Sequence, residues 1–137
     1  MKKVISGKKT GPRQFEMKHI ATGSVVVSDA PVPYGGQDSS FHPTDLLATA
    51  LASCSSVMMA LIADKQGLHL DGMNYEVSMK MDNKTHTITD IKIEFHLPAA
   101  INADKRSSIE NAINICPVHN ALNPNIKIEA VYHYDIQ

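Results

Sequence analysis

The sequence predicts an α+β domain in which a mainly antiparallel sheet packs on two helices. Three observations predict it: alternating apolar and polar residues in several short stretches, one long uncharged helical stretch, and a second helical stretch between the later strands. At 137 residues the chain is long enough to bury a core without disulfide bonds. We therefore expect a single domain over residues 1–137.

The first third of the chain predicts a β-hairpin followed by a loop. Residues 14–20 and 23–28 alternate in side-chain type and are separated by a short turn, which is typical of paired strands. Residues 30–42 then collect proline, glycine, aspartate and serine, which favour loops.

A long helix is predicted from Pro43 to about Gln66, with Gly67 ending it. Proline suits the first helical position, and Asp45 complements the positive end of the helix dipole. One apolar stripe recurs at steps of three and four residues: Leu47, Leu51, Cys54, Met58 and Leu61. The opposite side is almost as apolar, so the helix needs burial all round. One sheet cannot provide that burial, and we therefore expect a homodimer.

The remainder of the chain predicts three strands and a second helix. Residues 73–81 and 87–97 alternate and form a second hairpin, and residues 125–136 form a last strand. Residues 103–115 form the second helix, which places four residues on one face: Ile109, Ala112, Ile113 and Cys116.

Composition and charge exclude several protein classes. A net charge of -1 with 43% apolar residues argues against disorder and against nucleic-acid binding, and the lysines near the N-terminus are interpreted as a solvated strand end. Residues 46–63 carry no charge, which reaches the lower length limit for a membrane-spanning helix. Serines and a threonine interrupt this stretch, so we interpret it as a buried helix of a soluble protein. No apolar run follows the first lysines as in a signal peptide, and we expect a cytoplasmic protein.

The two cysteines, Cys54 and Cys116, each fall on the apolar stripe of a predicted helix. Taken singly, either is explained as a small buried hydrophobic residue. The predicted fold brings the two stripes together in the core. A permanent disulfide between them would contribute about 4 kcal/mol, which a cytosolic domain of this size does not need. We therefore interpret the cysteines as a transient, catalytic pair.

A reactive cysteine has to be a thiolate, which requires a positive neighbour. The helix dipole cannot serve, because Cys54 lies about three turns beyond the predicted helix start. Arginine suits this role because it stays charged when buried. The chain has two arginines. Arg106 is explained by solvation in the first turn of the second helix; for Arg13, placed at the start of an early strand, activation of a thiol and a plain surface role both stay open.

Four segments of the chain, in this order, resemble a known family: Gly35-Gly36-Gln37-Asp38, Pro43-Thr44-Asp45-Leu46-Leu47, Ala50-Leu51-Ala52-Ser53-Cys54 and Cys116-Pro117-Val118-His119. Together they resemble the OsmC/Ohr family of thiol-dependent peroxidases over nearly the whole chain. The resemblance implies an intertwined homodimer, in which two sheets wrap around central helices and the active sites lie at the dimer interface.

The resemblance also implies a reaction. Cys54 would be the peroxidatic cysteine that attacks an organic hydroperoxide, and Cys116 would resolve the sulfenic acid as an intramolecular disulfide. A dithiol such as a lipoylated protein would then reduce the disulfide, with no metal or bound cofactor. The implied biological role is defence against oxidative or osmotic stress.

Two positions depart from the family pattern. The family places a glutamate immediately after the helix-start proline, where it pairs with an N-terminal arginine, but this chain has Thr44 there and Asp45 next. Asp45 is the available substitute, although on an unbroken helix it lies roughly 13 Å from Cys54 along the axis. Asp45 could act on Cys54 only through an arginine that lies between them, for which Arg13 is the candidate, or if the helix breaks near residues 53–56.

Other functions stay open at this stage. A small-molecule-binding or redox-sensing protein could retain the fold without peroxidase turnover, as Thr44 in place of glutamate suggests. A metal site at Cys116-x-x-His119 is disfavoured, because a structural zinc site needs a second pair of ligands. His119 and His42 offer an acid or base, although a capping or surface role explains each of them.

Overall fold

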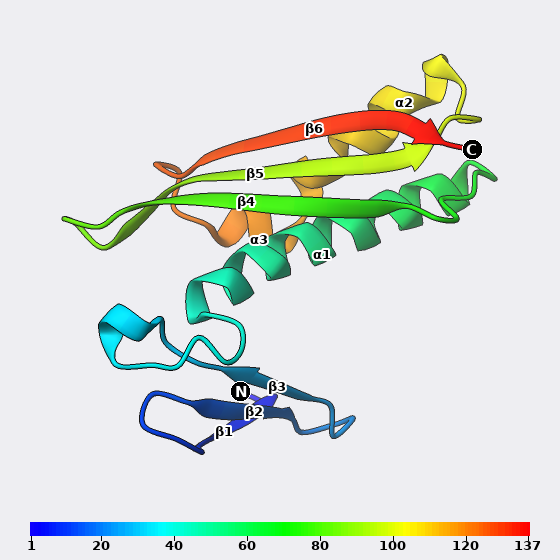
Figure 1. Ribbon diagram of the computed structural model, residues 1–137. Helices are drawn as coiled ribbons and strands as arrows, with labels where there is room; N and C mark the ends of the chain where they lie inside the picture. The colour runs from blue at the N-terminus through cyan, green and yellow to red at the C-terminus, as the bar shows by residue number, and fades with distance from the viewer. The chain divides into compact units, whose positions relative to one another are not determined.

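Three antiparallel strands open the chain in the computed structural model, which describes residues 1–137 (Figure 1). Their order in the sheet follows the sequence: β1 (Ile5–Lys9), β2 (Phe15–His19) and β3 (Val25–Ser28). The predicted hairpin is confirmed as β2 and β3, which pair from Phe15 opposite Ser28 to Lys18 opposite Val25. Strand β1 was not predicted from the sequence, because its residues, Ile-Ser-Gly-Lys-Lys, include few strand formers.

The chain divides into two units, Met1–Leu47 and Ala48–Gln137, and each is described by itself. The first unit holds the three-stranded sheet and the loop that follows it. This loop contains one short 3-10 helix, η1 (Val32–Tyr34). The expectation of a single domain over residues 1–137 stays a prediction.

The long helix, α1, runs without interruption over Pro43–Lys65. Gly67 follows it with a φ of 68°, in the left-handed region that glycine adopts readily. The predicted helix bounds are therefore confirmed, and the alternative of a break near residues 53–56 is wrong. By length and composition α1 could also cross a membrane, but the core helix of a soluble protein passes the same test.

The inward face of α1 differs from the predicted stripe by about one residue. Its buried residues are Ala48, Leu51, Ala52, Ser55, Met59 and Ala63. Leu47 and Leu61, which were predicted to face inward, are exposed. The reason is that α1 is apolar on all sides, so packing against the sheet, rather than the sequence pattern, decides which side is buried.

The second unit is built on a sheet of three strands in the order β4 (Asn74–Asp82), β5 (Thr87–Pro98) and β6 (Lys127–Ile136). Strands β4 and β5 form the predicted antiparallel hairpin, whereas β5 and β6 pair in parallel. A parallel pair needs a crossover connection. Here it consists of α2 (Ala103–Glu110), the 3-10 helix η2 (Asn111–Ile115) and α3 (Pro117–Ala121), where the sequence predicted one helix over residues 103–115.

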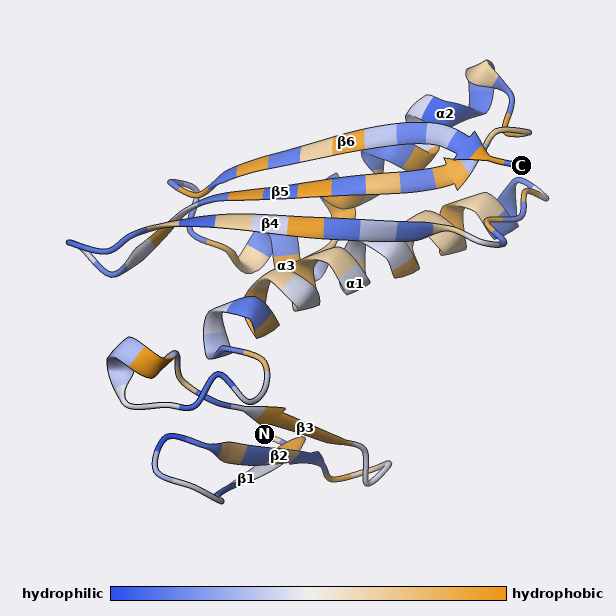
Figure 2. Cartoon of the chain, in the orientation of Figure 1, coloured by the Kyte–Doolittle hydropathy of each residue, from blue (hydrophilic) through white to orange (hydrophobic).

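The core of the second unit lies between this sheet and the helices on one of its faces (Figure 1). Apolar and polar residues alternate along β5, and the apolar set is fully buried: Ile91, Ile93, Phe95 and Leu97 (Figure 2). Phe95 stacks on Tyr132 with 5.4 Å between ring centroids and meets Tyr75 edge-on at 6.1 Å. This layer supports α1 and the segment that carries Cys116.

Candidate functional site

Two free thiols meet inside the second unit. Cys54 lies half-buried on α1, and Cys116, which is fully buried, follows η2 and begins α3. Cys116 belongs to the buried core of this unit, and Cys54 packs against that core. Two residues far apart in the sequence are thus brought into one core by the packing of two separate helical segments on one sheet.

The surroundings shift the pKa values of the two thiols in opposite directions. Burial raises the pKa of Cys54, and the neighbouring Cys116 side chain raises it further. Burial also works to raise the pKa of Cys116, but the side chains of Cys54 and Ser55 and the backbone N–H of His119 outweigh it, and the pKa is lowered. Ionisation is therefore favoured at Cys116 relative to Cys54.

Two further residues surround the Cys116 sulfur. The backbone N–H of His119 donates a hydrogen bond to Cys116 Sγ at 3.4 Å. The Ser55 hydroxyl is buried and contributes to lowering the pKa of Cys116, although Ser55 Oγ has no hydrogen bond of standard geometry. His119 Nδ1 is likewise buried without a partner. Ser55 was not predicted from the sequence, although a serine beside Cys54 in an apolar helix was the available signal.

Arg13 lies in the first unit, in a bend before β2 rather than on a strand as predicted. Its Nη1 donates to the carbonyl of Pro12 at 3.0 Å. The side chain lines a cavity of about 250 Å³ together with Asp29 and the backbone of Gly35 and Gly36. The guanidinium therefore borders a polar hollow formed by the loop between β1 and β2 and the loop after β3.

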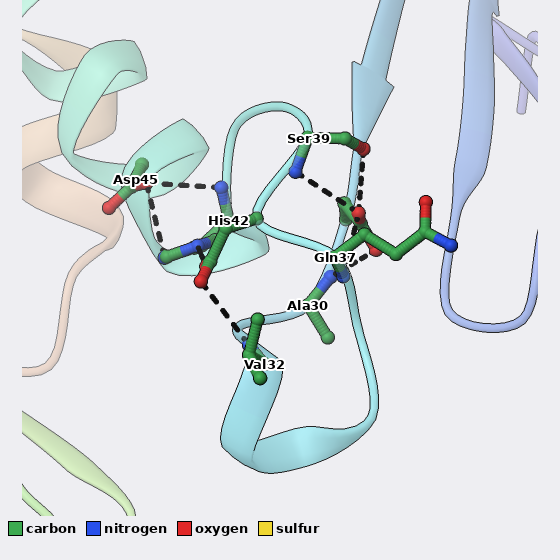
Figure 3. Close-up of polar contacts among 8 residues, drawn as sticks. Ala30, Val32, Gln37, Ser39, His42 and Asp45 are labelled. Atoms are coloured by element: carbon green, nitrogen blue, oxygen red, sulfur yellow. Dashed lines mark hydrogen bonds and ion pairs between the residues drawn. The ribbon is translucent and has the colours of Figure 1, made fainter.

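Asp29 organises the second of these loops. Only 2% of its surface is exposed, and its carboxylate accepts hydrogen bonds from the backbone N–H groups of Ala30 (2.8 Å), Gln37 (3.2 Å) and Ser39 (3.2 Å). The Ser39 hydroxyl donates a shorter bond of 2.6 Å. This hydroxyl bond, with the backbone donors, lowers the pKa of Asp29 against the effect of burial. Figure 3 shows Ala30, Gln37 and Ser39 in this network.

Asp45, the expected substitute for a glutamate, is bonded to His42 at the start of α1 (Figure 3). The backbone N–H of His42 donates to Asp45 Oδ2 at 3.0 Å, and His42 Nδ1 lies 3.7 Å from the same oxygen. His42 Nε2 lies 2.8 Å from Asp38 Oδ1. Asp45 thus caps the helix, and Thr44 beside it is half-buried. The first unit holds Arg13, Thr44 and Asp45, and the second unit holds both cysteines.

The sequence predicted that Arg106 is solvated, but its side chain contacts other parts of the chain. Its guanidinium carbon lies 4.0 Å from the ring centroid of Tyr134, and its Nε donates to the carbonyl of Ile101 at 3.1 Å. The Tyr134 hydroxyl in turn donates to Glu110 Oε1 at 2.8 Å. These contacts hold α2 against β6. No three His, Cys, Asp or Glu side chains lie where they could hold a metal ion together.

Comparison with solved structures identifies the fold. A proposed osmotic stress induced and detoxification response protein from Psychrobacter arcticus 273-4 is 24% identical, covers 97% of each chain and has a TM-score of 0.92. An OsmC-like protein from Mycoplasma pneumoniae is 16% identical over 96% of each chain, with a TM-score of 0.79. The organic hydroperoxide resistance protein OsmC from Legionella pneumophila is 19% identical over 94% of this chain and 96% of its own, with a TM-score of 0.70.

The family assignment rests on a direct match of the sequence. Residues 36–131, which are more than half of the chain, match the model of the family described as OsmC-like protein. The chain matches no curated protein. The matched segment contains both cysteines of the buried pair, and the similar structures share the fold over nearly the full length. The chain belongs to the OsmC-like protein family.

Proposed function

We propose that this protein is a thiol peroxidase that reduces organic hydroperoxides with two cysteines. The placement of Cys54 and Cys116 in one packed core carries the proposal, because a two-cysteine reaction needs its two thiols close together. Membership of the OsmC-like family supports it. So does the fold, which is shared with organic hydroperoxide resistance proteins from Legionella pneumophila and Elizabethkingia anophelis.

In the proposed reaction Cys54 is the peroxidatic cysteine, because it is the more accessible thiol. Its thiolate attacks one oxygen of the hydroperoxide; an S–O bond forms, the O–O bond breaks, and the alcohol leaves after taking up a proton. Cys116 then attacks the sulfur of the Cys54 sulfenic acid, so that an S–S bond forms and water leaves. An external dithiol, of which a lipoyl group is one example, reduces the disulfide and is itself oxidised. The proposal includes no resident metal or organic cofactor.

The first step requires a cation that lowers the pKa of Cys54, because burial raises it in the chain by itself. Arg13 is the proposed source. Thr44 and Asp45 are the proposed companions of this arginine, in the position where the family resemblance implies a glutamate. The proposed active form is an intertwined homodimer with its sites at the interface, in the cytoplasm.

Exposed apolar residues on α1 support the homodimer. Val57 and Leu61 remain 56% and 48% exposed although they lie in the middle of a strongly apolar helix. Leaving such a face in water is unfavourable, and a second copy of the chain covers it with the matching face.

Titration of free thiols tests the proposed reaction. One equivalent of cumene hydroperoxide or tert-butyl hydroperoxide, added to the reduced protein, is expected to remove both thiols and to leave an intramolecular disulfide detectable by mass spectrometry. Cys116→Ser is expected to lose its single thiol to a sulfenic acid that dimedone traps, whereas Cys54→Ser keeps its thiol. Persistence of both thiols in the unmodified protein would overturn the proposal.

Thr44, which stands where the family resemblance implies a glutamate, favours a second candidate, a small-molecule-binding or redox-sensing protein with little peroxidase turnover. Thr44→Glu distinguishes the two candidates, because it restores the carboxylate that the family resemblance implies. A large increase in the peroxidase rate would support a weakened enzyme that has become a sensor. If the unmodified protein already consumes hydroperoxide rapidly, and Thr44→Glu does not increase that rate, the sensor function is excluded.

A further inference from the structure

Glu110 is the last residue of α2, and two tyrosine hydroxyls of β6 hold it. The Tyr132 hydroxyl donates to the Glu110 backbone carbonyl at 3.0 Å. The Tyr134 hydroxyl donates to Glu110 Oε1 at 2.8 Å. Side chains two residues apart lie on the same face of a strand, so the two tyrosines reach one residue together. We call these three residues the Glu110 cluster; it joins the end of α2 to β6 through both the main chain and the side chain of Glu110.

The rings of both tyrosines are themselves held in place. Tyr132 stacks on the fully buried Phe95, with 5.4 Å between ring centroids. The guanidinium carbon of Arg106 lies 4.0 Å from the ring centroid of Tyr134. Burial and the neighbouring Glu110 raise the pKa of Tyr132 to about 12, and they raise the pKa of Tyr134 as well. Both hydroxyls therefore keep their protons near neutral pH and remain hydrogen-bond donors.

The Glu110 cluster lies at the start of the segment that carries Cys116. The 3-10 helix η2 begins directly after Glu110, has five residues, and is followed at once by Cys116. Ala112 of η2 and Cys116 are fully buried in the core against which both tyrosines pack. A reactive side chain on a packed helical segment is held more closely than one on a loop. Fixing Glu110 therefore fixes the start of the segment that ends at the sulfur of Cys116.

We propose that Tyr132 and Tyr134 are positioning residues for the resolving cysteine, Cys116. By holding Glu110 they fix the start of η2, and η2 holds Cys116 where it can reach the Cys54 sulfur. This proposal rests on the proposed two-cysteine function.

The proposed positioning acts on the step that closes the disulfide. The Cys116 thiol attacks the sulfur of the Cys54 sulfenic acid; the S–S bond forms, the S–O bond breaks, and the thiol proton leaves with the hydroxide as water. A sulfur that is already held in place loses little freedom when this bond forms. The hydrogen bonds of the Glu110 cluster should therefore make the disulfide both faster to form and more stable.

Tyr132→Phe and Tyr134→Phe each remove one hydroxyl and keep the ring, and Tyr75→Phe is their matched control. Tyr75 lies on the same sheet, but its hydroxyl takes no part in the Glu110 cluster. The measurement is the equilibrium between the intramolecular disulfide and the two thiols in a glutathione redox buffer, which gives the effective concentration of one thiol at the other. Each cluster variant is expected to lower this concentration about threefold to tenfold, and the control should not change it. Equal values for all three variants would overturn the proposal.

A second pair of variants tests the hydrogen bond at the Glu110 side chain. Glu110→Gln keeps an oxygen that accepts from the Tyr134 hydroxyl, whereas Glu110→Ala removes it. Glu110→Gln is expected to retain most of the effective concentration, and Glu110→Ala is expected to lose as much as Tyr134→Phe. Equal losses in Glu110→Gln and Glu110→Ala would contradict the proposal.

Denaturant titration separates positioning from a purely structural role. A residue that only supports the fold stabilises the dithiol and disulfide forms equally, so its removal leaves the equilibrium between them unchanged. Tyr132→Phe and Tyr134→Phe are expected to destabilise the disulfide form more than the dithiol form, at matched protein concentration. Equal losses in the two forms would assign the tyrosines a structural role and overturn the proposal.

These measurements also separate the proposal from the proposed peroxidase function, because diamide forms the disulfide and no hydroperoxide is used. A lower effective concentration in Tyr132→Phe and Tyr134→Phe, found together with no peroxide consumption by the unmodified protein, would support the positioning role and overturn the peroxidase. Rapid peroxide consumption with no effect of either variant would do the reverse.

Discussion

Cys54 packs against the buried core that contains Cys116, and the pKa values of the two thiols are shifted in opposite directions. Burial and the neighbouring Cys116 side chain raise the pKa of Cys54. For Cys116, burial is outweighed by the polar groups around its sulfur, and its pKa is lowered.

Removing the Cys54 side chain is expected to raise the pKa of Cys116. In Cys54→Ala the burial of Cys116 remains while a neighbouring group that lowers its pKa is lost, so its thiolate absorbance should develop at higher pH than in Cys54→Ser. The serine keeps a hydroxyl donor at the same position and serves as the control. Coincident titration curves for Cys54→Ala and Cys54→Ser would show that the donor does not matter.

The proposed homodimer predicts a measurable change in mass. Light scattering on the unmodified protein should give twice the chain mass of 15.0 kDa. Val57→Glu combined with Leu61→Glu is expected to give the monomer, because both charges would be buried at the interface. A charge reversal at the exposed Lys84, Lys84→Glu, is the control and should leave the mass unchanged. A monomeric unmodified protein would contradict the homodimer.

Gly36 is expected to be the glycine that tolerates substitution least. A Cβ atom there would clash with the carbonyl oxygen of Ala30, which is backbone and cannot move aside easily. Gly36→Ala should therefore lower the free energy of unfolding by about 3 kcal/mol or more. Gly67→Ala is the comparison: it has a φ of 68° and open space around it, so only backbone strain of about 1–2 kcal/mol applies.

Denaturant titration at matched protein concentration measures both glycine variants, since the stability of an oligomer depends on concentration. Equal losses for Gly36→Ala and Gly67→Ala would mean that the loop after β3 can shift to admit a side chain.

Asp29 is expected to make stability depend on pH in the acid range. Its pKa in the folded chain is below the ordinary value of 3.8, so its contribution is complete above that value and is lost as the pH falls through the lowered pKa. Asp29→Asn cannot offer the same acceptors to Gln37 and Ser39, and its melting temperature should be lower than that of the unmodified protein at about pH 7.

The difference in melting temperature between the unmodified protein and Asp29→Asn should shrink as the pH is lowered below about 4. Asp71→Asn, at an exposed aspartate, is the control and should show little difference at any pH. A constant difference between Asp29→Asn and the unmodified protein at all pH values would show that the carboxylate charge is not what holds the loop.

Local patterns predicted most of the secondary structure. Alternation located β2 through β6 to within one or two residues, and Pro43 and Gly67 bounded α1. Strand β1 was missed because a lysine-rich, glycine-containing stretch becomes a strand only through its pairing with β2. The helix at residues 103–115 was predicted as one segment, but it changes to a 3-10 helix at Asn111.

The candidate site was predicted less completely. The two cysteines stood out because the chain has no others, and the four matching segments indicated the family. The inward face of α1 was assigned one residue away from its true position, which placed Cys54 fully inside and left Ser55 unnoticed. A helix that is apolar all round carries no periodic signal for the side that packs.

The amino-acid sequence by itself determined the α+β class, the bounds of the long helix and the identity of the two thiols, because these follow from residue types and their spacing. The tertiary structure alone decided that Cys116 is fully buried, that its sulfur accepts a hydrogen bond from the backbone N–H of His119, and that Ser55 faces the core. These properties depend on which atoms of distant segments pack together. Packing sets the burial and the hydrogen bonds that move a thiol pKa.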